Sequence, residues 1–216
     1  MILKQKIRLI LFDLDGTLIQ SHIDFMAMRR QMNSILSRYG ILDEMRPNAF
    51  ILERIEYATQ KLGGNSQAIN ELWTCIDKFE EQGMQEAYIE EEVPIILEKL
   101  SNTRILGVVT NNSEKVANDV LVRFKIKNYF SIVVCRNKKR QPKPYPDNIL
   151  YTTNKLTINP EETLYIGDHI LDYMAAKNAN VHFIGYRLRH FNFPMIDSFN
   201  QLVDEIEKLE IDLEKM

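Results

Sequence analysis

Residues 11–18 read LFDLDGTL, an apolar run that ends in two aspartates followed by glycine and threonine. The apolar residues 7–12 predict a buried β-strand, and Asp13 and Asp15 come directly after it. Residues two apart in an extended chain face the same side, so the two carboxylates start as like-charged neighbours that hinder each other's ionisation. The structural alternative is an Asp-Gly turn at Asp15, capped by Asp13.

The C-terminal part of the chain alternates between apolar runs and helical patterns. We expect strands at residues 105–110, 131–135, 163–167 and 181–185, with helices that begin near Ser113, Pro146 and Ser198. This alternation of strands and helices is typical of a doubly wound, Rossmann-like parallel sheet, and residues 7–12 supply its first strand. We therefore predict an α/β fold.

Residues 20–90 differ from the rest because apolar side chains recur there at helical spacing. The clearest apolar stripe consists of Phe25, Met28, Met32, Ile35, Leu36 and Tyr39. Breaks at glycine and proline predict about four helices, and the breaking residues are Gly40, Pro47, Gly63, Gly64 and Gly83. We predict an inserted helical-bundle domain over residues 20–90, within an α/β core domain of residues 1–19 and 91–216.

The composition describes a soluble globular protein. Hydrophobic residues make up 45% of the 216 residues, charged residues 26%, and the net charge of -3 implies no general affinity for nucleic acid. The N-terminal apolar run is too short for a signal peptide or a membrane helix. Cys75 and Cys135 lie far apart without a CxxC motif, so we expect neither disulfides nor zinc, but a reduced, cytoplasmic protein that does not bind membranes.

Polar side chains follow three of the expected strands. Asp13 and Asp15 follow the first, Thr110 and Asn111 the second, and Asp168 the strand TLYIG. Ligands of open parallel sheets bind beyond the carboxyl ends of the strands, so we expect these residues to form one site.

The segment GDHILD adds a second acid, since Asp172 follows Asp168 by four residues and shares its face if a helix begins there. Oxygen ligands without histidine or cysteine favour Mg²⁺ over zinc. A helix cap and a solvated acid are the alternative for Asp172 alone.

Lys143 lies between two prolines in QPKPYPD, which holds it in a stiff loop. The alternative is a solvated lysine in the basic tract of residues 136–143. A carboxylate that approaches a phosphate meets a repulsion of about 4 kcal/mol per charge pair at roughly 4 Å, so attack requires cations in place. Acids, a hydroxyl and a lysine together indicate phosphoryl transfer.

Four segments resemble, in order, the motifs of the haloacid dehalogenase superfamily: LFDLDGTL, VVTNN, the lysine of QPKPYP, and IGDHILD. The likeness covers the whole chain, and the helical insertion is similar to the cap domain of the phosphoglycolate phosphatase and β-phosphoglucomutase branch. The resemblance implies a Mg²⁺-dependent phosphatase, monomeric or a small homo-oligomer, that hydrolyses a small phosphorylated metabolite such as phosphoglycolate or a sugar phosphate.

Residue by residue, the resemblance makes Asp13 the nucleophile that forms an aspartyl-phosphate. Asp15 would protonate the leaving group and then activate water. The Asp13 carboxylate, the Asp15 backbone carbonyl and Asp168 would hold Mg²⁺, with Asp172 acting directly or through water.

The resemblance also implies a phosphate-binding set. Thr110 and the backbone N–H groups around Gly16 and Asn111 would hold the phosphoryl oxygens. Lys143 would neutralise the charge shared by the phosphate and Asp13.

The start of the insertion departs from many relatives, which have an aspartate-serine pair where this chain has Gln20 and Ser21. Substrate contacts are therefore open. Candidates in the insertion, each with an exposed helix charge or polar group as its alternative, are Arg29, Arg30, Lys61 and Asn65. A surface or supporting role is the preferred interpretation of His22 and His169.

Other activities stay open to different degrees. A phosphomutase would use the same two aspartates, and a non-catalytic phosphate-binding module could keep the fold. Dehalogenation is disfavoured because Asp15 is present, and a phosphonatase has only Lys61 as a candidate Schiff-base lysine. A nucleic-acid interface would rest on residues 136–140 alone, which lack interleaved aromatics.

Overall fold

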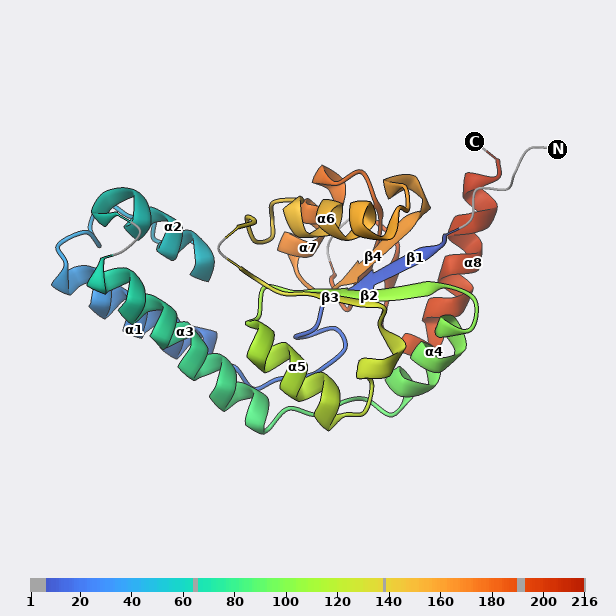
Figure 1. The fold of residues 1–216 in the computed structure, drawn as a ribbon, viewed down its shortest axis with the longest axis horizontal. Helices are drawn as coiled ribbons and strands as arrows, with labels where there is room; N and C mark the ends of the chain where they lie inside the picture. The colour runs from blue at the N-terminus through green and yellow to red at the C-terminus, as the bar shows by residue number, and fades with distance from the viewer. Residues whose placement is uncertain (1–6, 64–65, 138, 190–192, 216) are drawn as a thin grey trace. The chain divides into compact units, whose positions relative to one another are not determined.

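The structure is a computed structural model that describes residues 7–63, 66–137, 139–189 and 193–215. The chain forms two compact units (Figure 1). The first joins Met1–Gln20 to Tyr88–Met216, and the second is Ser21–Ala87. Each unit is described by itself.

The first unit contains one parallel sheet. Its strands are β1 (Leu9–Phe12), β2 (Ile105–Val109), β3 (Ile132–Val134), β4 (Thr163–Gly167), β5 (His182–Tyr186) and β6 (Met195–Ile196). They are ordered β3-β2-β1-β4-β5-β6, and each neighbouring pair is parallel. The predicted α/β fold is confirmed. Strand β6 was not predicted, because two residues are too few to show a period.

Helices cover both faces of this sheet, as the doubly wound class requires. They are α4 (Glu92–Ser101), α5 (Glu114–Arg123), α6 (Asp147–Leu156), α7 (Ile170–Asn178) and α8 (Leu202–Leu213). In Figure 1, α6 and α7 lie above the sheet, and α4 and α5 lie below it. Helix α5 begins where expected, because the Ser113 side chain caps it by accepting the Val116 N–H.

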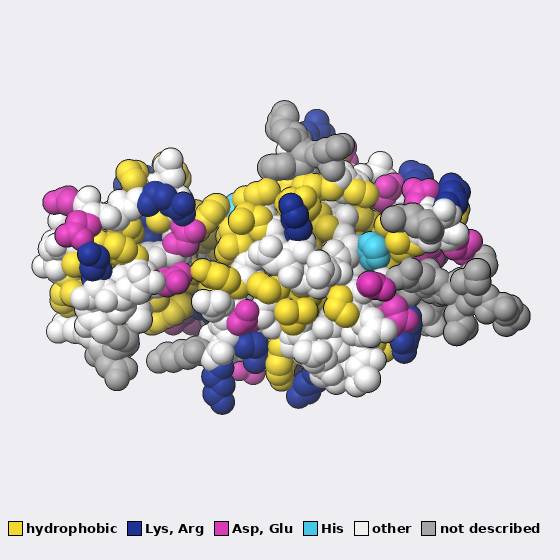
Figure 2. Space-filling model, turned by 90° about the horizontal axis from the view of Figure 1, so that it is seen from above, with side chains coloured by type: hydrophobic (Ala, Val, Ile, Leu, Met, Phe, Trp, Pro, Cys, Tyr) yellow, Lys and Arg dark blue, Asp and Glu magenta, His cyan; other side chains and the backbone are white. Residues whose placement is uncertain are grey.

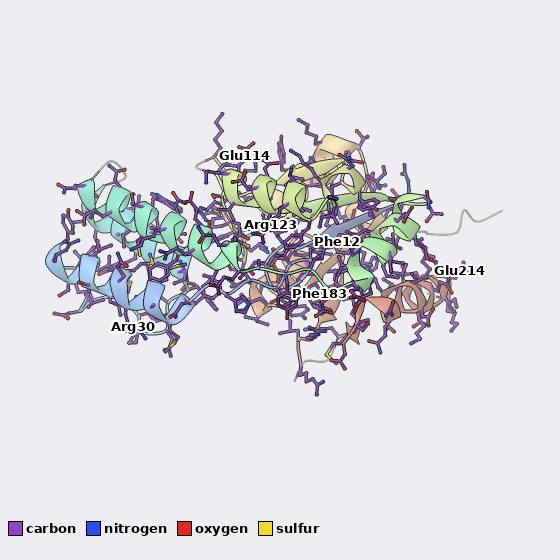
Figure 3. All side chains as sticks on the ribbon, turned by 90° about the horizontal axis from the view of Figure 1, so that it is seen from below. Phe12, Arg30, Glu114, Arg123, Phe183 and Glu214 are labelled. Atoms are coloured by element: carbon purple, nitrogen blue, oxygen red, sulfur yellow. The ribbon has the colours of Figure 1, made fainter. Side chains whose placement is uncertain are left out.

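Strand β1 is fully buried and lies at the centre of the sheet, between β2 and β4. Leu9 and Leu11 belong to the apolar cluster on the side of α6 and α7. Phe12 faces the other way, where its ring lies 6.1 Å from that of Phe199 (Figure 3). Because side chains alternate along a strand, Asp13 continues on the side of Leu9 and Leu11.

The face above the sheet also carries exposed apolar side chains. Figure 2 shows hydrophobic groups gathered on this side, and Tyr151 of α6 and Met174 of α7 are 37% and 41% exposed.

In the part of the chain that the structure describes, no helix has the length and apolar character needed to cross a membrane. Cys75 and Cys135 are buried and are not joined in a disulfide.

The second unit consists of α1 (Phe25–Arg38), α2 (Ile51–Leu62) and α3 (Gln67–Gln85). The apolar stripe of α1 packs inward as expected at Met28, Met32, Ile35 and Leu36. Phe25 was wrongly included in this stripe: it is the first residue of α1 and is 51% exposed.

The prediction of about four helices in the insertion was wrong, since its described residues form three helices. Helix α3 continues through Gly83, which was expected to break it. A Cβ atom at this position would lie 2.5 Å from the Ile23 Cα atom, so Gly83 permits the close approach of a neighbouring backbone.

Candidate active site

Three aspartates meet at the carboxyl edge of the sheet. Asp13 follows β1, Asp168 follows β4, and Asp172 lies in the first turn of α7. Each offers a carboxylate oxygen, and these oxygens lie within 4.8 Å of one another. Asp13 and Asp172 are buried, and Asp168 is half-buried. The expected convergence of strand ends therefore brings together three acids.

Lys143 inserts its ammonium group into this acidic group. Its Nζ atom lies 2.7 Å from Asp13 Oδ1 and 2.5 Å from Asp172 Oδ1, and the side chain is 4% exposed. Burial alone would lower the pKa of Lys143, but the charges of Asp13 and Asp172 outweigh it and raise this pKa. The lysine is therefore charged, and it neutralises part of the negative charge of the site.

The backbone of Lys143 is held by Asn111. The Lys143 N–H donates to Asn111 Oδ1 at 3.0 Å, and Asn111 Nδ2 donates to the Lys143 carbonyl at 3.1 Å. The family resemblance implied a role only for the backbone N–H of Asn111. The two-point contact of its side chain explains how the loop places the lysine beside a strand distant in the sequence.

Thr110 directly follows β2 and is 1% exposed. Its hydroxyl donates to Asn112 Oδ1 at 2.8 Å and accepts the Asn112 N–H at 3.1 Å. The Thr110 side chain is therefore fixed by Asn112, a residue that the sequence analysis did not select. Thr110 and Asp13 lie on neighbouring strand ends, because β1 and β2 pair in register.

Gly16 and Thr17 together shape the space around Asp168. Gly16 has a φ of +85°, and a Cβ atom there would lie 2.2 Å from Asp168 Oδ2. Any other residue would be both strained and too close to the carboxylate. Thr17 Oγ1 donates to Asp168 Oδ1 at 2.7 Å, which orients this carboxylate. Gly16 is therefore required for steric reasons, and Thr17 is required for its hydrogen bond to Asp168.

Asp15 is half-exposed, and its side chain is not part of the group formed by Asp13, Asp168 and Asp172. It lies in a turn closed by hydrogen bonds from the Gly16 N–H to Ile19 O at 2.8 Å and from the Ile19 N–H to Leu14 O at 2.9 Å. Metal binding through its backbone carbonyl stays a prediction.

The site has an excess of negative charge. Burial, and then the charge of Asp172, raise the pKa of Asp13 to about 7 against the opposing effect of Lys143. Burial, Asp172 and Asp13 likewise raise the pKa of Asp168 well above its usual value. One lysine does not balance three carboxylates, so a divalent cation fits the charge of the site. The all-oxygen donors suit Mg²⁺.

The other predicted residues lie outside this group of acids or in the helical unit, with one backbone contact: the His169 N–H donates to Asp172 Oδ2 at 3.0 Å. His169 is exposed and caps α7, its Nδ1 accepting the Leu171 N–H at 3.2 Å. In the helical unit, Lys61 forms an ion pair with Glu44 at 2.5 Å, and Arg30 is exposed (Figure 3). The remaining candidates are His22, which is exposed, Arg29, which is half-buried, and Asn65, which lies outside the described residues.

The fold and the site define an α/β enzyme whose acids and lysine meet at the carboxyl ends of parallel strands. The sequence profile of the haloacid dehalogenase-like hydrolases matches residues 10–186, and the chain belongs to this family. The resemblance seen in the motifs is confirmed, as is the prediction of a hydrolytic enzyme of the phosphatase group.

Curated relatives of similar length are phosphatases by name. The chain is 31% identical to the phosphoglycolate phosphatase of Aquifex aeolicus, over 80% of this chain and 81% of the relative. It is 25% identical to the N-acetylmuramic acid 6-phosphate phosphatase of Pseudomonas aeruginosa, over 82% and 80%. It is 26% identical to the pyrophosphatase PpaX of Bacillus mycoides, over 81% and 80%.

Solved structures agree on the fold. A predicted phosphoglycolate phosphatase from Haemophilus somnus has a TM-score of 0.65 at 23% identity, covering 93% of this chain and 97% of that one. A 2-haloacid dehalogenase from Pseudomonas syringae has a TM-score of 0.63 at 20% identity, covering 94% and 99%. Since one fold carries both activities, the fold alone does not select the reaction.

Proposed function

We propose that this protein is a Mg²⁺-dependent phosphatase that hydrolyses a small phosphorylated metabolite through a phosphoryl intermediate on Asp13. The observation that carries the proposal is the contact of the Lys143 ammonium with Asp13 Oδ1 at 2.7 Å, inside a group of three carboxylates. Such a lysine can neutralise charge shared by an attacking carboxylate and a phosphate. The printed names of the curated relatives support the same class of reaction.

In the first step, an oxygen of Asp13 attacks phosphorus, and the bond between phosphorus and the leaving-group oxygen breaks. Asp15 gives its proton to that oxygen, so the alcohol departs neutral. In the second step, Asp15 takes a proton from water as the water attacks phosphorus. The Asp13–phosphorus bond then breaks and releases inorganic phosphate.

Thr110 and the backbone N–H groups of Gly16 and Asn111 would hold the phosphoryl oxygens, and Lys143 would balance their charge. Asp13, the Asp15 carbonyl and Asp168 would hold Mg²⁺, with Asp172 acting directly or through water. When bound, the ion would reduce the repulsion between the phosphate and the carboxylates.

We further propose that residues 20–90 act as a cap domain that selects the substrate, while residues 1–19 and 91–216 supply the chemistry. The division of the chain into two compact units supports these boundaries. The chain passes from one unit to the other after Gln20 and returns before Tyr88. Relatives named for phosphoglycolate and for N-acetylmuramic acid 6-phosphate support phosphomonoesters as the substrate class.

The test is phosphate release from phosphoglycolate, hexose phosphates and pyrophosphate, with and without a chelator. We expect Asp13→Asn to reduce kcat by roughly three to six orders of magnitude, because the nucleophile is lost. The exposed Asp119→Asn variant is the matched control and should behave as wild type. Equal activity of Asp13→Asn and wild type would refute the mechanism. Conversion of a hexose 1-phosphate to its 6-phosphate without free phosphate would indicate a mutase.

A further inference from the structure

Tyr165 lies in the middle of β4 and is fully buried, yet its hydroxyl reaches the candidate active site. The hydroxyl oxygen lies 2.9 Å from Lys143 Nζ, 2.8 Å from the Val109 carbonyl and 3.2 Å from Asp172 Oδ1. A tyrosine in the apolar strand TLYIG appears in the sequence as an ordinary core residue. Its polar end instead contacts the loop lysine, the end of β2 and the start of α7.

The strand order explains this reach. Tyr165 pairs with Leu11 of β1, and β1 separates β4 from β2. To contact Val109, the side chain must extend past β1 on the side of α6 and α7, where Leu11 also lies. Val109 directly precedes Thr110, so the tyrosine connects Lys143 to the strand that carries the phosphate-binding threonine.

The donors and acceptors around the hydroxyl can be counted. A phenol has one proton, and the shorter contact assigns it to the Val109 carbonyl. The oxygen can then accept a hydrogen bond from Lys143. The ammonium has three N–H donors, and three oxygen atoms surround it. It donates hydrogen bonds to Asp172 Oδ1 and to the Tyr165 hydroxyl, and it forms an ion pair with Asp13 Oδ1 at 2.7 Å. Burial, and then the charges of Asp172 and Asp13, raise the pKa of Tyr165, which keeps the phenol protonated.

We propose that Tyr165 is a positioning residue whose hydroxyl directs the Lys143 ammonium toward Asp13. Without this third acceptor, the ammonium can turn toward Asp172, whose Oδ1 atom is already its nearest contact at 2.5 Å. The lysine charge would then be displaced from the position where an attacking Asp13 and a phosphate need it. The expected kinetic effect rests on the proposed function, whereas the placement of the ammonium does not.

A packing role alone is the competing explanation. The ring of Tyr165 lies in the apolar cluster and makes an edge contact with the ring of Phe183, with centroids 6.4 Å apart (Figure 3). Tyr165→Phe keeps this ring and removes only the oxygen, so it separates the two roles.

Tyr186→Phe is the matched control. Tyr186 lies on the neighbouring strand β5, is also fully buried, and donates its hydroxyl to Glu90 Oε2 at 3.1 Å. For Tyr165→Phe we expect kcat/KM to fall about 10- to 100-fold, as for the loss of a hydrogen bond to a charged group. Tyr186→Phe should stay within about twofold of wild type despite a similar change in Tm. Equal activity of the two variants would overturn the proposal.

A double-mutant cycle tests whether Tyr165 acts through Lys143. If it does, Tyr165→Phe should cause no further loss of kcat/KM in a Lys143→Met background. If Tyr165 acts only by packing, the two losses should multiply, and that result would also overturn the proposal.

A measurement without substrate separates this inference from the proposed function. In Tyr165→Phe, we expect the crystal structure to show the Lys143 ammonium shifted from Asp13 toward Asp172. An unchanged ammonium overturns the inference, even if the wild type is a phosphatase. If the wild type hydrolyses no substrate but the shift occurs, the proposed function fails and the placement role of Tyr165 stands.

Discussion

Among the residues that the structure describes, two cations are deeply buried, one in each compact unit, and their surroundings differ. Lys143 in the α/β unit is 4% exposed and contacts two carboxylates, Asp13 and Asp172. Arg54 in α2 of the helical unit is 1% exposed, and its guanidinium donates to Asn33 Oδ1 and, at 3.1 Å, to the Pro47 carbonyl. Lys143 is thus neutralised by charged carboxylates, whereas Arg54 is hydrogen-bonded to neutral acceptors.

This difference separates the candidate active site from a structural ion site. The charges of Asp13 and Asp172 raise the pKa of Lys143 despite its burial, whereas burial, and then the charge of Arg29, lower the pKa of Arg54. The carboxylates around Lys143 can exchange partners when a phosphate or a metal ion arrives. The neutral groups around Arg54 fix the segment at Pro47 against α1 and α2.

Among the changes that test the contrast between the two buried cations, Lys143→Met has the largest expected effect. Because the variant removes the positive charge beside Asp13, we expect kcat/KM for the best substrate to fall about 10²- to 10³-fold. Steady-state kinetics across the substrate panel measures this loss. The exposed Lys139→Met variant of the same basic tract serves as the control. If the activity of Lys143→Met stays within twofold of the control, Lys143 stabilises the folded protein by neutralising Asp13 and Asp172 and does not contribute to catalysis.

A smaller effect is expected for Thr17→Val, which removes the hydrogen bond that orients Asp168. We expect the Mg²⁺ concentration for half-maximal activity to rise about 10- to 100-fold, as when a partner of a metal ligand is lost. Calorimetric titration of Mg²⁺ into the protein gives the same comparison without substrate. Thr152→Val, another fully buried threonine whose hydroxyl donates to a helix carbonyl, is the control. An unchanged metal requirement would argue against Asp168 as a ligand.

The smallest effect on catalysis is expected for Arg54→Met. The change leaves Asn33 Oδ1 and the Pro47 carbonyl without their donor, so the free energy of unfolding should fall by about 1–2 kcal/mol. Urea denaturation followed by circular dichroism measures it, with the exposed Arg30→Met variant for comparison. The kcat of the folded variant should match wild type. A selective rise in KM at unchanged stability would instead make Arg54 a substrate contact, and the contrast with Lys143 would no longer hold.

The sequence predicted the sheet and the convergence of Asp13, Asp168 and Asp172 at its carboxyl edge, because the signals of both are local. Apolar runs that end in Asp13, Thr110 and Asp168 mark strand ends, and the topology of parallel sheets brings such ends together. Lys143 could be placed by its proline-bounded loop and by family resemblance. The resemblance paired it with Asp13 and the phosphate, whereas its contact with Asp172 at 2.5 Å was not predicted.

Tyr165 could not be found in this way. Tyr165 lies within an apolar strand, and its hydrogen bond to Val109 crosses 56 residues of sequence, so no local pattern reports it. The prediction for Gly83 was wrong because the sequence does not distinguish a glycine that permits close packing from a glycine that ends a helix. The difference depends on Ile23, which packs against it from outside the helix.

Gln20 and Tyr88, the residues that flank the helical insertion, form an antiparallel bridge. The N–H of Gln20 donates to Tyr88 O at 2.9 Å, and the N–H of Tyr88 donates to Gln20 O at 3.0 Å. The α/β unit thus closes the loop at its base, and the closure entropy grows only slowly with the length of the inserted segment. We therefore expect the α/β unit to keep this bridge, and the register of its sheet, when the segment 21–87 is shortened or lengthened.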